Sequence, residues 1–222
     1  MQFDGGPDVT NLAIRWTRNA ALVIVPIMLA GCGVNAIPTK LQKAKAAWAD
    51  VQSQYQRRAD LVPNLVETVQ GYANQEKTVL IAVTQARASA TQVKVDASTV
   101  TNPAAFQRYQ AAQNQLSGVL GRLLAISENY PDLKSNQNFL ALQSQLEGTE
   151  NRIAVTRRDY NEAVRDYDTE LTTLPGSIWA NTFYSSSKSM QLFEASSAAQ
   201  ASPKVKFTPT PNPTPPVTSA PK

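Results

Sequence analysis

Residues 41–72 repeat mostly apolar side chains at alternating steps of three and four, and few folds accommodate such a repeat. The spacing places all of them on one stripe of an α-helix, in the heptad pattern that packs one helix against another. Pro63 lies inside this segment and removes one backbone donor, but the pattern continues past it. We therefore predict one long, kinked helix rather than two. The stripe consists of Leu41, Ala44, Trp48, Val51, Tyr55, Arg58, Val62, Leu65, Val69 and Tyr72.

Three further segments have helical spacing, at about 75–94, 103–129 and 135–171. Asn102 and Pro103 form a typical helix start, and Leu174-Pro175-Gly176 is typical of a helix end. We expect residues 178–193, which lack a clean period, to form a short helix or a loop packed on the end of the bundle. Glycine is scarce and strand patterns are almost absent, so the expected fold is all-α: an elongated, antiparallel four-helix bundle.

The amino-terminal region resembles a bacterial lipoprotein signal. Arginines precede an apolar stretch over residues 20–30, and Leu29-Ala30-Gly31 leads directly to Cys32, the single cysteine. In a lipobox the cysteine is acylated and the chain is cut before it, and several acyl chains together give stable anchoring. We therefore expect Cys32 to be a lipidation site. The alternative is an uncleaved membrane anchor helix in which Cys32 is an ordinary small residue.

The carboxyl-terminal residues differ in composition from the rest of the chain. Proline recurs from residue 203 to residue 222, separated by small and polar residues, and such a segment cannot form a packed core. The expected domains are an anchor segment at 1–32, a helical bundle at 33–200 and a disordered tail at 201–222. The net charge of +4 is compatible with an anionic lipid surface but is too weak and dispersed to indicate nucleic acid.

The chain offers few groups for catalysis. It contains no histidine, and its one cysteine is the expected lipid site. These absences remove the commonest metal ligands and most nucleophile–base pairs. Ser187 and Lys188 are adjacent, and adjacent side chains rarely orient as a catalytic dyad. We therefore predict no catalytic residue, no cofactor and no metal site.

Charged residues near the helical stripes are the remaining candidates for structural or interaction roles. Arg58 and Arg157 fall on stripe positions, where a buried charge is costly unless it is paired. One interpretation is that these arginines pair with Asp60, Glu147 or Glu150 across helices and fix the register. The other is that they form a groove for a partner helix or a lipid headgroup. The charged candidates are Arg57, Arg58, Asp60, Glu147, Glu150 and Arg157, and Pro63 within the first helix is a further structural candidate.

Two long motifs resemble the LemA family. The first is Trp48-x-x-Val51-x-x-x-Tyr55-Gln56-Arg57-Arg58-x-Asp60-Leu61-Val62-Pro63-Asn64-Leu65. The second is Leu142-Gln143-x-Gln145-Leu146-Glu147-x-Thr149-Glu150-Asn151-Arg152-Ile153, followed by Tyr160-Asn161-x-x-Val164. The resemblance covers about residues 34–193. It implies an amino-terminal membrane anchor followed by a helical bundle that faces away from the cytoplasm, and a molecular function that is poorly defined.

Together these observations predict a non-enzymatic, membrane-anchored helical scaffold of the bacterial cell envelope. Its partners would be membrane lipid, bound through the acylated cysteine or the anchor helix, and further copies of itself in a homo-oligomer. The bundle would face the periplasm or the cell exterior. The alternative is an adaptor for a membrane protease or another envelope quality-control protein. An enzyme that uses only carboxylates is the least favoured reading, because the chain shows no acid–base pair.

Overall fold

The computed structural model describes residues 33–93, 96 and 98–194, and every regular element in these ranges is a helix. The all-α prediction is therefore confirmed. Cys32, the upstream apolar stretch and the proline-rich tail lie outside the described residues. The helices are α2 (Ala36–Tyr72), α3 (Lys77–Gln92), α4 (Pro103–Ser127), α5 (Pro131–Lys134), α6 (Gln137–Thr172) and α7 (Gly176–Thr182).

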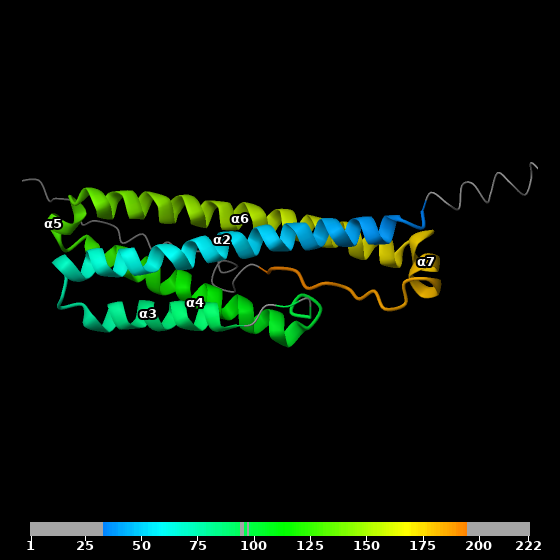
Figure 1. Cartoon of the computed structure of the whole chain (residues 1–222), viewed down its shortest axis with the longest axis horizontal. Helices are drawn as coiled ribbons and strands as arrows, with labels where there is room; N and C mark the ends of the chain where they lie inside the picture. Colours follow the sequence, from blue (N-terminus) through cyan, green and yellow to red (C-terminus); the bar gives the residue numbers. More distant parts are fainter. Residues whose placement is uncertain (1–32, 94–95, 97, 195–222) are drawn as a thin grey trace, which may run out of the picture.

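Helices α2 and α6 form a long antiparallel pair that runs the length of the molecule (Figure 1). α2 is a single helix that continues through Pro63, as the repeat predicts. The stripe positions from Ala44 to Val69 are all buried, which explains why the repeat is uninterrupted. The last stripe residue, Tyr72, is 46% exposed because α2 ends there.

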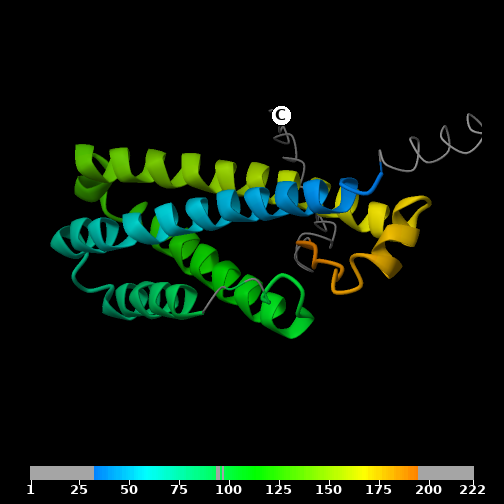
Figure 2. The ribbon, with the colours of Figure 1, turned by 45° about the vertical axis from the view of Figure 1, so that its right-hand side comes forward.

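Helices α3 and α4 pack against each other and lie beside one half of the α2–α6 pair (Figure 2). The other half is accompanied by α7 and by residues 183–194, which run back toward the start of α4. We call residues 183–194 the returning segment. The long pair is thus covered by helices over one half of its length and by extended chain over the other.

The returning segment is more deeply packed than its sequence indicates. We expected a short helix or a loop on the bundle end, and α7 matches that expectation, but Met190 and Phe193 are buried in the core. Backbone hydrogen bonds hold the segment in place: the Gln191 N–H donates to the Val100 carbonyl at 2.7 Å. The Asn161 side chain also donates to and accepts from the backbone of Phe193, each at 2.9 Å.

The buried apolar side chains form two clusters along the molecule. The aromatic cluster surrounds Trp48, whose ring lies 5.3–6.0 Å from the rings of Phe106, Tyr109, Tyr160 and Phe193. The aliphatic cluster lies toward the α5 end and joins α2, α3, α4 and α6. Burying one large apolar side chain contributes about 1.5–3 kcal/mol, so the two clusters supply most of the driving force for folding. The aliphatic cluster is built around Val62, Leu65, Val83, Leu116, Leu123 and Phe139.

Local signals fix several helix boundaries. The Asn102 side chain accepts hydrogen bonds from the backbone N–H groups of Ala104 and Ala105 at 3.0 and 3.2 Å, which makes it the N-cap of α4. At the turn between α6 and α7 a Cβ on Gly176 would lie 2.1 Å from the Glu170 carbonyl oxygen, so no other residue fits without displacing the chain. Pro131 begins α5, because proline suits the first helical position.

Among residues 33–93, 96 and 98–194, no helix combines the length and the apolar character needed to cross a bilayer.

Candidate functional site

Arg58 is the one charged residue buried among the described residues of the core, with 1% of its surface exposed. It lies on α2 between the aromatic and aliphatic clusters. Its Nη1 donates to Ser117 Oγ at 2.7 Å and to Glu150 Oε1 at 2.9 Å. Its Nη2 donates to Oε1 of Gln113 at 2.6 Å and to the backbone carbonyl of the same residue at 3.1 Å. A buried guanidinium with this many partners compensates much of its lost hydration.

These contacts connect the four long helices at one level. Gln113 and Ser117 come from α4, and Glu150 comes from α6. The Gln113 side chain also donates to the Ala90 carbonyl of α3 at 3.3 Å. The Ser117 hydroxyl lies 3.2 Å from the second carboxylate oxygen of Glu150. We call Arg58, Gln113, Ser117 and Glu150 the Arg58 node.

The surroundings of the node keep its charge pair intact. The Arg58 guanidinium lies 4.9 Å from the centre of the Tyr55 ring, within the range of a cation–π contact. Burial raises the pKa of the Tyr55 hydroxyl and that of the Tyr109 hydroxyl. Both tyrosines therefore stay neutral at physiological pH, and Glu150 is the anion that balances Arg58.

On its outer side the node reaches the surface. The Glu150 side chain is 38% exposed and lines a groove of about 420 Å³ between α4 and α6, together with Leu120 and Leu146. The carboxylate of Glu150 and the guanidinium of Arg58 are hydrogen-bonded to each other. This arrangement suits fixing helices in register better than transferring a proton.

A second polar contact lies one helical turn away, at the proline of α2. Because Pro63 has no N–H, the carbonyl of Ala59 loses its partner within the helix. The Nε of Arg87, on α3, donates to that carbonyl at 2.8 Å. Ala59 is buried, and an unpaired carbonyl there would be costly. Arg87 thus replaces the hydrogen bond that the proline removes and ties α3 to α2.

The other charged candidates do not join the node. Asp60 is exposed and accepts from Gln56 of its own helix at 2.7 Å, and Glu147 is exposed and accepts from Gln143 at 3.0 Å. The interpretation that Asp60 and Glu147 pair across helices is therefore wrong; both point away from the core. Arg57, next to the node in sequence, is also exposed.

Arg157 has a different role from the one its stripe position suggested. Its guanidinium lies 4.5 Å from the centre of the Phe193 ring. It also donates to the Glu194 carbonyl at 3.2 Å. Arg157 therefore contacts the returning segment rather than a carboxylate on another helix.

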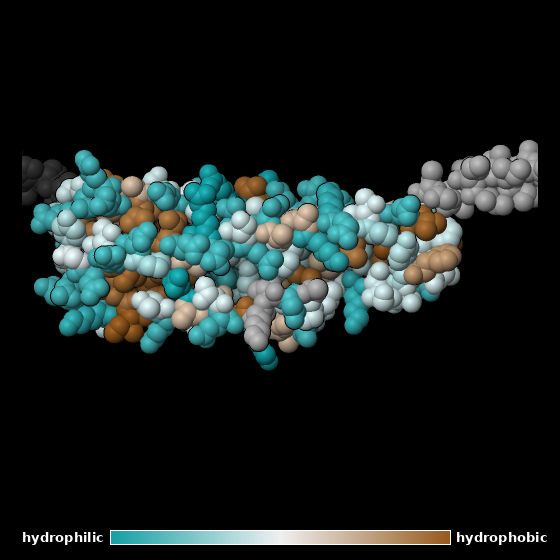
Figure 3. Space-filling model, viewed as in Figure 1, coloured by the Kyte–Doolittle hydropathy of each residue, from teal (hydrophilic) through white to brown (hydrophobic). Residues whose placement is uncertain are grey.

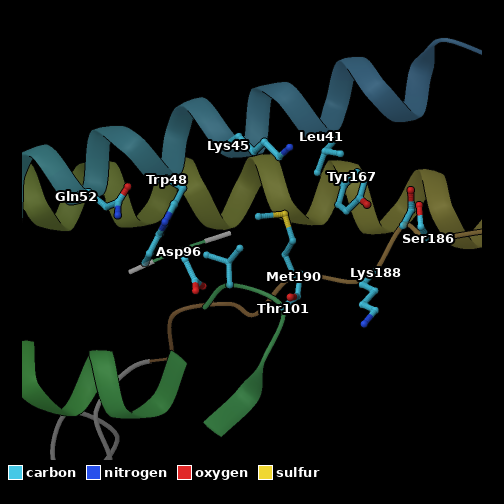
Figure 4. Close-up of a pocket in the computed structure, with 12 residues that line it drawn as sticks. Leu41, Lys45, Trp48, Gln52, Asp96, Thr101, Tyr167, Ser186, Lys188 and Met190 are labelled. Carbon is cyan, nitrogen blue, oxygen red and sulfur yellow. The ribbon is translucent and has the colours of Figure 1, made fainter. Parts of the chain in front are cut away.

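A separate cleft of about 560 Å³ opens beside the returning segment (Figure 4). Trp48 and Leu41 from α2, Tyr167 from α6 and Met190 from the returning segment contribute apolar surface. Polar groups, among them Lys45, Asp96, Ser186 and Lys188, also line it. An apolar cleft with a few polar groups is typical of a binding site. No group of three or more potential metal ligands occurs within residues 33–93, 96 and 98–194.

Sequence reasoning missed half of the Arg58 node. Gln113 is a polar residue on the apolar stripe of its helix, at a position where a buried hydrogen-bonding role is detectable. Ser117 and Arg87 carry no such signal, because their partners are set by the packing of helices far apart in the sequence.

The Arg58 node predicts a large loss of stability when the cation alone is removed. Arg58→Met keeps side-chain length but strands Glu150 and Gln113, and we expect the free energy of unfolding to fall by about 3 kcal/mol. Adding Glu150→Leu should recover part of this loss, because no carboxylate then lacks its partner. Arg57→Met, an exposed neighbour, should change stability by less than about 0.5 kcal/mol. Chemical unfolding followed by circular dichroism measures all four proteins, and an unchanged Arg58→Met variant would refute the structural role.

The Pro63–Arg87 contact predicts a specific coupling between two variants. Arg87→Met should lower stability by about 1–2 kcal/mol, because the Ala59 carbonyl becomes unpaired. In a Pro63→Ala background the backbone N–H of residue 63 can donate to the same carbonyl, so the cost of Arg87→Met should fall below about 0.5 kcal/mol. A double-mutant cycle of unfolding free energies tests this. Equal costs in the two backgrounds would show that Arg87 acts in another way.

Known proteins named LemA and MamQ are similar to this chain in sequence. Protein LemA of Metamycoplasma hominis is 26% identical over 131 residues, covering 59% of this chain and 54% of that protein. The chain thus spans about half the length of that relative. Magnetosome protein MamQ of Magnetospirillum gryphiswaldense is 24% identical over 186 residues, covering 77% of this chain and 67% of that protein. Magnetosome protein MamQ 2 of Paramagnetospirillum magneticum is 38% identical over 64 residues, covering 29% of this chain and 24% of that protein. The LemA family model matches residues 47–207, which include the Arg58 node, Pro63, Arg87 and the returning segment, and the chain belongs to the LemA family.

Proposed function

We propose that this protein is a non-enzymatic helical scaffold, attached to a membrane of the bacterial cell envelope, that assembles with copies of itself. Family membership and the likeness to magnetosome proteins support a role at membranes. The proposed arrangement is an antiparallel bundle of α2, α3, α4 and α6, held in register by the Arg58 node. Such a bundle supplies a rigid surface rather than a reaction centre.

The observation that carries self-assembly is an apolar surface on α2 and α3. Val66, Leu80 and Ile81 line a shallow groove of about 340 Å³. Ile81 is 55% exposed, Val66 is half-buried, and Leu80 is buried at the floor of the groove. Figure 3 shows hydrophobic residues gathered over these two helices. We call these three residues the α2–α3 patch.

The residues around the α2–α3 patch favour a second copy as its partner. They are mostly uncharged and polar, with Gln70, Asn74 and Gln85 among them and Lys77 as the single charged member. An apolar centre with a polar rim is typical of protein interfaces. A surface with so little charge can face its own copy across a two-fold axis without strong repulsion.

Membrane attachment through Cys32 is the second part of the proposal. Leu29-Ala30-Gly31-Cys32 matches a lipobox. We expect a clickable fatty acid to label the wild-type protein in cells, and Cys32→Ser to lose the label and remain uncut, because the acylated thiol is then absent. In-gel fluorescence after click coupling measures this. Equal labelling of the two proteins would eliminate Cys32 as the lipid site.

Self-assembly predicts a defined effect of one exposed substitution. The full-length protein in mild detergent should have the mass of an oligomer by light scattering. Ile81→Arg should shift it toward the monomer, because a two-fold interface would place two cations together. Val155→Arg, which changes an apolar residue that is 46% exposed on α6, is the matched control and should leave the mass unchanged. Oligomers that survive Ile81→Arg would place the interface elsewhere.

The cleft beside the returning segment favours the alternative function, an adaptor for a membrane protease or another envelope protein. Its apolar floor could hold a side chain of a client segment. An adaptor should be monomeric in mild detergent until its partner is added, whereas a self-assembling scaffold is large on its own. The same light-scattering measurement separates the two.

A further inference from the structure

We propose that α7 presents a second membrane-contact surface, which enters the lipid headgroup region beside the amino-terminal attachment point. The inference rests on the proposed membrane attachment and adds the surface through which the folded part of the protein meets the lipid. The surface consists of Ile178 on α7 and of Leu174 and Phe183, which flank the helix, and we call these three residues the α7 patch.

The α7 patch is unusually exposed for such apolar side chains. Leu174 is 76% exposed, Phe183 is 69% exposed and Ile178 is 52% exposed. The first two are the most exposed large apolar residues in the described part of the chain. Hydrophobic residues are visible at that end of the molecule in Figure 3. Three such side chains within the ten residues 174–183, at one end of the molecule, are typical of a protein or membrane contact.

The position of the patch identifies the lipid as its occupant. The described chain begins at Gly33, at the same end of the molecule as α7 (Figure 1). A Cβ built on Gly33 would lie 3.2 Å from Nε1 of Trp179, so the main chain of Gly33 packs directly against α7. Cys32 directly precedes Gly33 in the sequence, and consecutive Cα atoms are about 3.8 Å apart. An acyl group on Cys32, or an anchor helix that ends there, therefore enters the bilayer next to the patch.

The chemistry of this end favours apolar insertion over attraction to anionic lipid. Lys40 pairs with Glu170, and Lys43 pairs with Asp166, so cations and anions of α2 and α6 neutralise one another near α7. Trp179 packs 5.8 Å from the ring of Phe183. Tryptophan prefers the boundary between headgroups and acyl chains. A surface with apolar side chains, a tryptophan and little net charge gains free energy mainly by burying area.

The α7 patch is also held rigidly. Gly176 allows α7 to fold tightly against the end of α6. The Cα of Gly176 lies so close to the Glu170 backbone that no side chain fits there. The Phe183 N–H donates to the Trp179 carbonyl at 2.9 Å, which closes the helix. A rigid patch inserts without the entropic cost of ordering a loop, so three side chains suffice to orient the molecule on a surface that already holds its amino terminus.

The test uses the full-length protein in phosphatidylcholine liposomes whose acyl chains carry bromine near the headgroup, which quenches nearby tryptophan. All variants carry Trp16→Phe, which leaves the buried Trp48 and the half-buried Trp179 as a background common to every variant. Phe183→Trp reports on the patch. Tyr72→Trp is the matched control: it is an aromatic position, 46% exposed, at the opposite end of α2.

We expect the added emission of Phe183→Trp to fall by about twofold in brominated liposomes, since interfacial side chains reach about 5–10 Å into the bilayer boundary. The loss should be the same at low and high salt, because apolar burial is not screened. Tyr72→Trp should keep its emission in the same liposomes.

Flotation of the liposomes separates failure of the inference from failure of the proposed function. A protein that does not float with the vesicles contradicts membrane attachment itself. If it floats but Phe183→Trp is quenched only by aqueous iodide, the patch faces water and the inference is overturned. If Phe183→Trp is shielded from both brominated lipid and iodide, the chain's own apolar segment or a second copy covers the patch, which also overturns it.

Discussion

The buried guanidinium of Arg58 is the constraint on which the arrangement of the helices depends. Apolar side chains at heptad positions tolerate sliding, because one apolar neighbour can replace another at small cost. A buried cation does not tolerate it. A shift of one helical turn moves a side chain by about 5.4 Å and would separate Arg58 from Glu150, Gln113 and Ser117 together. The node therefore selects one register for α2, α4 and α6, and the bond from Gln113 to Ala90 brings α3 into the same register.

The neighbouring Pro63 shows how a local defect became a tertiary contact. A proline within a helix costs about 3 kcal/mol or more, partly because one carbonyl loses its donor. Here the donor comes from α3, so the defect in α2 is compensated only when α3 is packed correctly. Arg87 joins α3 to α2, and Arg58 joins α2 to α4 and α6, at neighbouring positions along α2. The charged residues of this region thus specify which helices are neighbours, while the two apolar clusters supply the driving force.

How far the sequence predicts this structure depends on the range of the contacts involved. The stripes of α2 and α6 identify their buried residues because 3.6-residue periodicity is a local property. The N-cap at Asn102 and the break between α6 and α7 at Pro175–Gly176 are local signals too. The stripe position of Arg58 indicated a buried pair, and Glu150 was one of its expected partners. Ser117, the Ala59–Arg87 bond and the placement of Phe193 in the aromatic cluster were not predictable in this way. Each depends on residues more than 20 positions apart, and the returning segment has no period that would reveal its buried face.

The α7 patch and the α2–α3 patch lie at different places along the described part of the chain. The α7 patch is at the end where the described chain begins, and the α2–α3 patch lies toward the other end, beyond the Arg58 node. A protein that uses the first for lipid and the second for another copy must keep both in a fixed relation. An apolar residue at position 58 would fill the same space but would leave the register of the helices to apolar packing alone. Directional hydrogen bonds from one guanidinium to two other helices fix that register, which gives a physical reason for a buried charge at this level of the molecule.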